Sequence, residues 1–139
     1  MRYFLLFLFI AISSIGFSQS KEININWDGY RVFSTSSAQF EIPYFNNHNF
    51  NFTPSKGISL SAQWSENIEI DQNSIIIENV VLSDISLEDL KQLDKNIIPK
   101  ELTYDIKTSI SRGKMYLFLD LFQIINQNGN FKKVNSFRF

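Results

Sequence analysis

The chain has 139 residues, a formal net charge of −1 and no cysteine. The missing cysteine excludes disulfide bonds, thiolate nucleophiles, cysteine–zinc sites and the lipid-modified cysteine of a lipoprotein. The charges are nearly balanced and form no basic stripe, which argues against nucleic acid as a partner. Phe is the commonest aromatic residue, and Asn, Ser and Ile are frequent, a composition typical of sheets and loops rather than of helices.

Residues 1–18 have the features of a cleavable export signal. Arg2 supplies the positive start, residues 4–12 form an unbroken apolar run, and Gly16 and Ser18 are small residues spaced for cleavage after Ser18 or one residue later. The alternative is a membrane anchor, but the run is shorter than the roughly 20 residues that a spanning helix needs. We therefore expect an exported protein whose residues 19–139 form a single domain without a stable membrane span.

The first predicted strands lie before residue 46. Residues 22–27 alternate between polar and apolar, which predicts a strand with one buried face. Asp28-Gly29 then predicts a two-residue hairpin turn, because both residues tolerate the positive φ that such a turn needs. The predicted return strand covers residues 30–34. A further strand within residues 37–45 contains Pro43, which suits an edge strand or a strand end.

The next predicted elements are a loop and the most regular strand of the chain. Residues 46–57 are rich in Asn and contain Pro and Gly, which predicts a loop. The sequence ISLSAQW follows and alternates strictly. We therefore expect Trp64 in the core, and Ser61 and Gln63 on a solvated face.

Two more strands and the one predicted helix come next. Residues 67–82 predict strands on either side of a turn at 71–74, and the triple Ile at 75–77 predicts a strand buried on both faces. Ser86 is a candidate helix cap, and the spacing of Leu residues over 87–94 predicts a short helix.

The last third has the clearest hairpin pattern. Residues 102–110 and 115–121 alternate on either side of an Arg112-Gly113 turn, and Asn128-Gly129 leads into a final strand over 131–139. We expect the strand at 115–125 beside this final strand, and an open apolar edge that promotes self-association on its other side.

These elements together predict a mainly β fold. We expect an antiparallel β-sandwich of about seven to nine short strands, with frequent turns between them. The one short helix is expected around residues 87–94, packed on a sheet because two turns are not stable alone.

The sequence predicts no catalytic, cofactor-binding or metal-binding residue. His48 is the only histidine and falls in the predicted loop, so we interpret it as a solvated side chain. Two sets of acidic residues, Glu66/Glu69/Asp71 and Glu88/Asp89, could in principle supply the two carboxylates of a glycosidase. The first set is better explained by the solvent-exposed face of a strand, and the second by the N-terminus of a helix.

Three weaker patterns could also indicate a binding or modification site. Residues 71–74 resemble the start of a calcium loop, but they lack the Gly and the distal Glu of an EF-hand, so a plain turn is favoured. Asn51-Phe-Thr53 is a nominal glycosylation site. Aromatic residues in the first third either fill the core, the favoured interpretation, or form a binding face for sugar or protein. They are Trp27, Tyr30, Phe33, Tyr44, Phe45, Phe50 and Phe52.

The succession of segments resembles a known family. An export signal ending GFSQ precedes INWDGYRVFSTSSAQFEIPYF and ISLSAQW, which are followed by ISLEDLKQLDKNIIPKEL, a strand pair and INQNGNFKKVNSFRF. This order is similar to the N-terminal region of the type IX secretion system sortases of the PorU family, gingipain-type cysteine peptidases of Gram-negative bacteria. The resemblance covers residues 21–139, and its weight lies in the order of the segments rather than in one sharp motif.

The resemblance implies a function for a longer parent protein, of which this chain is a truncated part. Sortases of this family cleave the C-terminal secretion signals of cargo proteins and attach the cargo to lipopolysaccharide at the cell surface. Their catalytic Cys–His pair lies in a caspase-like domain further along the chain, and no catalytic residue of the family maps onto this sequence.

The expected role is therefore that of a non-catalytic, propeptide-like domain in the periplasm or at the outer-membrane cell surface. The implied partners are the peptidase domain of the parent chain or other secretion-system components. Inhibition, chaperoning and docking of the peptidase all stay open. The alternative is a free-standing secreted β-sandwich that binds a partner or a glycan.

Overall fold

The structure is a computed structural model that describes residues 20–66 and 70–139. The expected export signal at 1–18 lies outside the described residues. The described residues form ten strands and two short 3₁₀ turns, so the predicted mainly β fold is confirmed. The strands are β1 (Glu22–Asn24), β2 (Trp27–Ser34), β3 (Gln39–Phe45), β4 (Asn49–Thr53), β5 (Gly57–Glu66), β6 (Glu78–Asp84), β7 (Tyr104–Ser111), β8 (Lys114–Phe122), β9 (Ile124–Gln127) and β10 (Asn130–Arg138).

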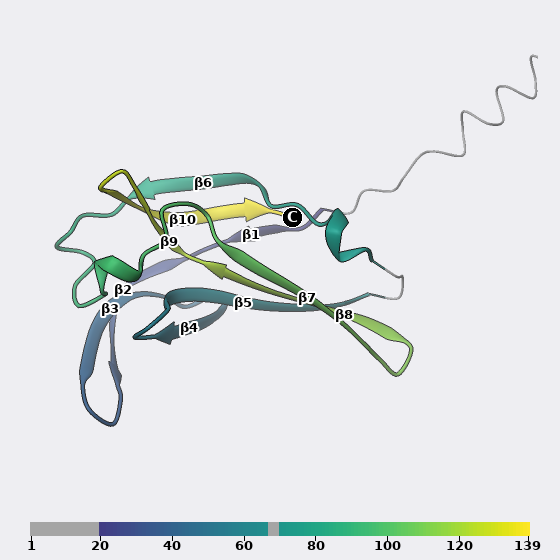
Figure 1. The fold of residues 1–139 in the computed structure, drawn as a ribbon, viewed down its shortest axis with the longest axis horizontal. Coiled ribbons are helices and arrows are strands. Elements are labelled where there is room, and N and C mark those ends of the chain that lie inside the picture. The colour runs from purple at the N-terminus through teal and green to yellow at the C-terminus, as the bar shows by residue number, and fades with distance from the viewer. Residues whose placement is uncertain (1–19, 67–69) are drawn as a thin grey trace, which may run out of the picture.

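All pairings between strands are antiparallel, and the strands form two main layers. One layer, the β10 sheet, has β10 at its centre, β6 on one side, and β9 and β1 one after the other on the opposite side. The other layer, the β8 sheet, has the order β4-β5-β8-β7. Strands β2 and β3 pair only with each other and project from one end of the two layers as a ribbon (Figure 1).

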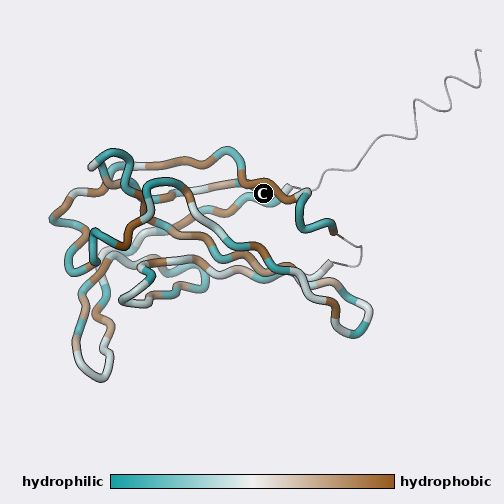
Figure 2. The backbone as a smooth tube through the Cα atoms, viewed as in Figure 1, coloured by the Kyte–Doolittle hydropathy of each residue, from teal (hydrophilic) through white to brown (hydrophobic). Residues whose placement is uncertain are grey.

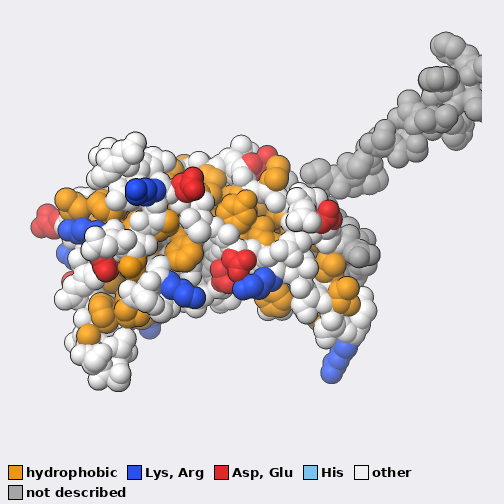
Figure 3. All heavy atoms as spheres, viewed as in Figure 1, with side chains coloured by type: hydrophobic (Ala, Val, Ile, Leu, Met, Phe, Trp, Pro, Cys, Tyr) orange, Lys and Arg blue, Asp and Glu red, His pale blue; other side chains and the backbone are white. Residues whose placement is uncertain are grey.

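The hydrophobic core is formed by buried residues of both layers. In Figure 2 hydrophobic segments, coloured brown, occur along strands of both layers. Alternate residues of β8 (Leu117, Leu119 and Leu121) are buried from one side, and Val134 and Phe137 of β10 are buried from the other. This arrangement is a β-sandwich, in which the inner faces of two sheets exclude water from each other. The surface in Figure 3 carries Lys and Arg interspersed with Asp and Glu over the visible face.

The chain crosses between the layers at Gln123, which separates β8 from β9. The backbone N–H of Gln123 donates to Ile58 of the β8 sheet, and its carbonyl accepts from Val134 of the β10 sheet. The side chain is fully buried, its Nε2 donates to the carbonyl of Leu121, and its Oε1 has no partner among the described residues. One residue thus joins both sheets.

The predicted turns at the two later hairpins are confirmed. Arg112 and Gly113 have φ of 52° and 74°, and Asn128 and Gly129 have φ of 54° and 93°. Both central residues of each turn therefore take the left-handed conformation that two-residue hairpins require. The turn at 71–74 is also present as a 3₁₀ turn, Gln72–Ser74, capped by the Asp71 carboxylate. The strand predicted around ISLSAQW forms as β5.

The predicted helix at 87–94 is wrong. Ser86 does cap this segment, since its hydroxyl accepts from the N–H of Asp89. Lys91, however, has a φ of 53°, and the N–H of Gln92 donates to Glu41 of β3 rather than along a helix. Residues 87–92 form turns, and a 3₁₀ turn, Lys95–Ile97, follows. Pairing with the edge of β3 therefore outweighs the weak preference of a two-turn helix.

Three other local predictions are wrong. The Asp28-Gly29 hairpin does not form, because β2 continues through it with a register shift between Trp27 and Tyr30. The predicted loop at 46–57 contains β4, which pairs with β5. Residues 75–77 precede β6 and are not in a strand, and Ile76 is 62% exposed.

The final strand also differs from expectation. The open edge expected on β10 does not exist, because β10 has neighbours on both sides. After β10, the backbones of Phe139 and Lys21 exchange two hydrogen bonds of 2.8 and 3.0 Å. The strand predicted over 115–125 as a neighbour of the final strand is divided at Gln123 into β8 and β9. Only β9 pairs with β10, whereas β8 pairs with β5 and β7 in the other sheet, so this prediction is only partly right.

Candidate functional site

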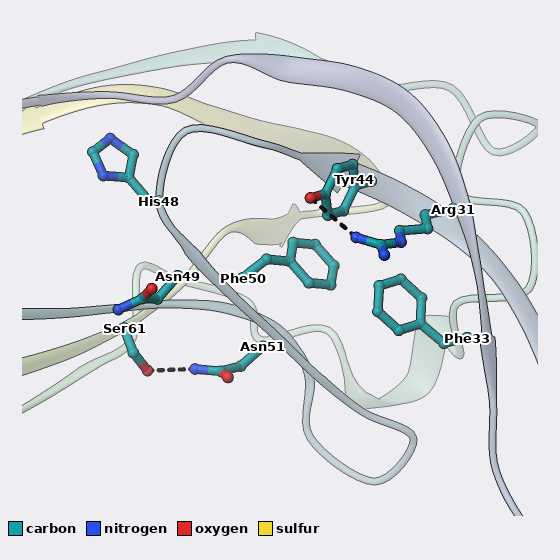
Figure 4. A pocket seen from close by; sticks show the side chains of 8 residues that line it. All are labelled: Arg31, Phe33, Tyr44, His48, Asn49, Phe50, Asn51 and Ser61. Carbon is teal, nitrogen blue, oxygen red and sulfur yellow. Dashed lines mark hydrogen bonds between the residues drawn. The ribbon is translucent and has the colours of Figure 1, made fainter.

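An open groove lies where the β2–β3 ribbon meets β4, the edge strand of the β8 sheet. Its volume is about 460 Å³, within the range of small-ligand sites. Figure 4 shows the side chains around it: Arg31, Phe33, Tyr44 and Phe50 lie on one side of β4, and Asn49, Asn51 and Ser61 lie on the other. The lining residues are Arg31, Phe33, Tyr44, His48, Asn49, Phe50, Asn51 and Ser61.

Aromatic rings in contact with one another build the apolar part of the groove. The rings of Phe33 and Phe50 stack with their centroids 5.2 Å apart, and Tyr44 lies 5.0 Å from Phe50. Phe45, which is fully buried, supports Phe50 from the core side at 4.9 Å. These contacts join the ribbon to β4, so the groove has a supported wall rather than isolated exposed rings.

Arg31 is the cation of the groove and is held by the same rings. Its guanidinium lies 5.0 Å from the centroid of Tyr44 and 5.8 Å from that of Phe33. Its Nη1 donates to the hydroxyl of Tyr44 at 3.2 Å. No carboxylate of the described residues forms an ion pair with Arg31. The remaining N–H groups of this guanidinium are therefore available to an anion from outside.

Amides and a hydroxyl lie on the other side of β4, on the outer face of the β8 sheet. The amide of Asn51 donates from Nδ2 to the hydroxyl of Ser61, which in turn donates to the carboxylate of Asp120 (Figure 4 shows the first of these bonds). The Asn51 side chain keeps its oxygen as an acceptor, and Asn49 lies exposed beside it. This part of the outer face therefore presents both donors and acceptors.

A second surface of interest is the outer face of the β8 sheet. On β8 the residues that alternate with the buried leucines are Tyr116, Phe118 and Phe122, with Asp120 between the last two. Phe118 is 37% exposed, although it lies on an inner strand of the sheet with Gln63 and Lys107 as its cross-strand partners. We call Tyr116, Phe118 and Phe122 the aromatic stripe.

His48 is half-buried, so the expectation of a fully solvated side chain is only partly right. Its Nε2 lies 2.8 Å from the carbonyl oxygen of Asn24, which can only accept, so this nitrogen carries the proton. The contact links the 46–48 segment to β1. The ring thus has a structural role, and it lines one end of the groove.

Two of the acidic residues singled out in the sequence, Asp71 and Asp89, accept local hydrogen bonds that stabilise turns or connect segments. Asp71 caps the 3₁₀ turn at 72–74, which agrees with the plain turn favoured over a calcium loop. Asp89 accepts hydrogen bonds from Tyr30 and Ser86, and the first of these contributes most to lowering the pKa of its carboxyl. The same bond raises the pKa of Tyr30. Glu69 and the side chain of Glu66 lie outside the described part of the structure.

The aromatic residues of the first third of the chain are partly core residues and partly lining of the groove. Phe45 belongs to the core, and Trp27, Phe50 and Phe52 pack against it while half-buried. Phe33, Tyr44 and Phe50 also line the groove. Sequence reasoning did not find Arg31 or Ser61, because no local pattern shows that β2 and β5 reach the same groove.

Residues 20–66 and 70–139 contain no group of three or more His, Asp or Glu side chains placed to hold a metal ion. Within the same residues no helix has the length and hydropathy needed to cross a bilayer. Comparison with protein-family models, curated proteins and solved structures finds no match.

Proposed function

We propose that this chain is the non-catalytic N-terminal domain of a type IX secretion system sortase of gingipain type. The order of its segments supports this proposal. The full-length parent would cleave the C-terminal secretion signals of cargo and attach the cargo to the cell surface. This domain contributes no catalytic residue to that reaction, and its site of action is the periplasm or the outer-membrane surface.

The observation that supports a docking role is the aromatic stripe. Side chains on the outer face of an antiparallel sheet are usually polar, as Ser59, Ser61 and Gln63 of the neighbouring β5 are. Three aromatic residues at alternate positions of an inner strand instead offer the kind of anchors that dominate protein interfaces. The proposed partner is the peptidase domain of the parent chain.

Binding of the purified domain to a separately produced gingipain-type sortase peptidase domain tests this role. Phe118→Ser should weaken the complex about thirtyfold or more if the ring is an interface anchor. Ile110→Ser is the matched control, because Ile110 is also exposed, at 69%, but lies near the tip of the β7–β8 hairpin. Equal binding by both variants, or no binding by the wild-type domain, would refute docking through the stripe.

The second candidate function is a free-standing secreted β-sandwich that binds a ligand. The groove beside Arg31 favours it, since a guanidinium that lies beside aromatic rings and has no ion pair with a described residue is a ligand-binding feature. The reading frame after the codon of Phe139 distinguishes the two candidates. Continuation into a peptidase domain supports the sortase, and a stop codon at this position supports the free-standing protein.

A further inference from the structure

We propose that two copies of this chain associate through β4, edge to edge and antiparallel, about a two-fold axis that passes through Asn51. The two β8 sheets then form one continuous sheet across the axis. This inference does not depend on the sortase proposal, because it uses the edge of the β8 sheet and not the aromatic stripe on its outer face.

The outer edge of β4 is open to a further strand. Among the described residues only β5 forms a ladder with β4, and the other backbone bond of this strand is a turn bond from the N–H of Lys56 to the carbonyl of Thr53. The β2–β3 ribbon contacts β4 through aromatic rings, such as Phe33 on Phe50. Figure 1 shows β4 at the margin of its sheet. The backbone N–H and C=O groups along this margin can therefore bond to another strand.

The edge of β4 also lacks the features that usually keep edge strands apart. Its sequence, NFNFT, contains no charged residue and no Pro. The exposed strands β1, β6 and β7 each contain an Asp or a Glu, and the ribbon strands β2 and β3 contain Arg31 and Glu41. The neutral strand β9 is covered at Asn126, whose N–H donates to the carbonyl of Pro99. Of the described strands, β4 is thus the neutral one whose edge is left open.

The sequence of β4 is nearly the same in both directions, so the strand is complementary to its own copy. A two-fold axis at Asn51 sets Asn51 opposite Asn51 of the second copy, Phe50 opposite Phe52, and Asn49 opposite Thr53. All five residues of β4 pair in this register, and the members of each pair lie on the same face. Phe50 and Phe52 are half-buried, so their pairing across the axis covers ring surface that a single copy leaves exposed.

A second copy is favoured over a strand from another protein. A neutral edge gives a different partner no charge by which it could be selected. The chain's own β4 matches the edge in length, in charge and in the order of aromatic and polar residues. The exposed side chains of Asn49, Asn51 and Thr53 supply polar pairs on the outer face, and no like charges meet at the axis.

Sedimentation of the purified protein over a range of concentrations tests the association. The wild type should form a dimer whose fraction rises with concentration. Asn51→Lys sets two ammonium groups opposite each other at the axis and should weaken the dimer about tenfold or more. Ser109→Lys is the matched control, because it adds the same charge at an exposed position of β7, the other edge of the same sheet, and should leave the dimer unchanged. Thermal unfolding verifies the fold of each variant.

Cross-linking tests the register, since the chain has no cysteine of its own. Directly opposite residues of an antiparallel pair have Cα atoms roughly 4.5–5.5 Å apart, within the range of a disulfide. Under mild oxidation Asn51→Cys should therefore give a covalent dimer. Asn49→Cys should not cross-link to itself, but it should cross-link to Thr53→Cys when the two variants are mixed. A protein that stays monomeric, a dimer that Asn51→Lys leaves intact, or cross-linking of Asn49→Cys as readily as of Asn51→Cys would overturn the inference.

Discussion

The ring of Trp64, on β5, lies 4.4 Å from the ring of Phe139, the residue that follows β10. The contact joins the β8 sheet to the β10 sheet at the end of the molecule where Lys21 also lies, with its Nζ 5.6 Å from the Trp64 ring. Trp64 is half-buried and packs against the core, so its expected burial is only partly realised, and Ser61 is half-buried rather than exposed.

Trp64→Ala should lower the free energy of unfolding by about 2–4 kcal/mol, somewhat below the cost for a fully buried aromatic residue. Gln63→Ala is the control, since this exposed neighbour should change stability by less than about 0.5 kcal/mol. Urea unfolding of both variants measures the difference. A loss below about 1 kcal/mol for Trp64→Ala would show that the contact between the sheets contributes little.

Tyr30 and Asp89 should be linked in their titration. The hydroxyl of Tyr30 donates to the Asp89 carboxylate and lowers its pKa, so the bond stabilises the fold above the unfolded-state pKa of Asp89 and is lost as pH falls through the folded-state pKa. In Tyr30→Phe the pKa of Asp89 should rise, and NMR titration of the carboxyl carbon measures it. Tyr104→Phe is the control. An unchanged Asp89 titration in Tyr30→Phe would contradict the assignment.

Gln123→Met should change the free energy of unfolding by less than about 1 kcal/mol. The substitution loses the bond to the Leu121 carbonyl, but it also removes the buried Oε1 that has no partner in the described structure, and the two effects oppose each other. Leu121→Ala, a cavity-forming control, should cost about 2–5 kcal/mol. A loss above about 2 kcal/mol for Gln123→Met would show that the amide is needed where the chain crosses between sheets.

The purified protein should leave peptide substrates intact. The reason is chemical, because the sequence has no cysteine and the Nε2 of its single histidine is engaged by a backbone carbonyl. Incubation with fluorogenic peptides, before and after a second purification, measures this. Cleavage that survives repurification and disappears in His48→Gln would contradict the prediction.

The sequence by itself determined the fold class, several strands, two hairpin turns and one capping residue. Alternation over residues 58–64 and 115–121 indicated strands because successive side chains of a strand point to opposite faces. Arg112-Gly113 and Asn128-Gly129 indicated turns because Gly tolerates the positive φ that a tight turn needs. Ser86 was also recognised as a cap, although the segment after it does not become a helix. These features depend on neighbours in the chain.

The tertiary structure alone decided which strands pair and where a groove lies. Asp28-Gly29 can form a turn, but β2 continues through these residues because it pairs with β3. The segment with the predicted helix is not helical at Gln92, whose N–H donates to the carbonyl of Glu41 on β3. The groove draws its lining from β2, β3, β4 and β5, which the folded chain brings together. Such contacts join residues distant in sequence, and their free energy comes from burial and pairing that no local pattern records.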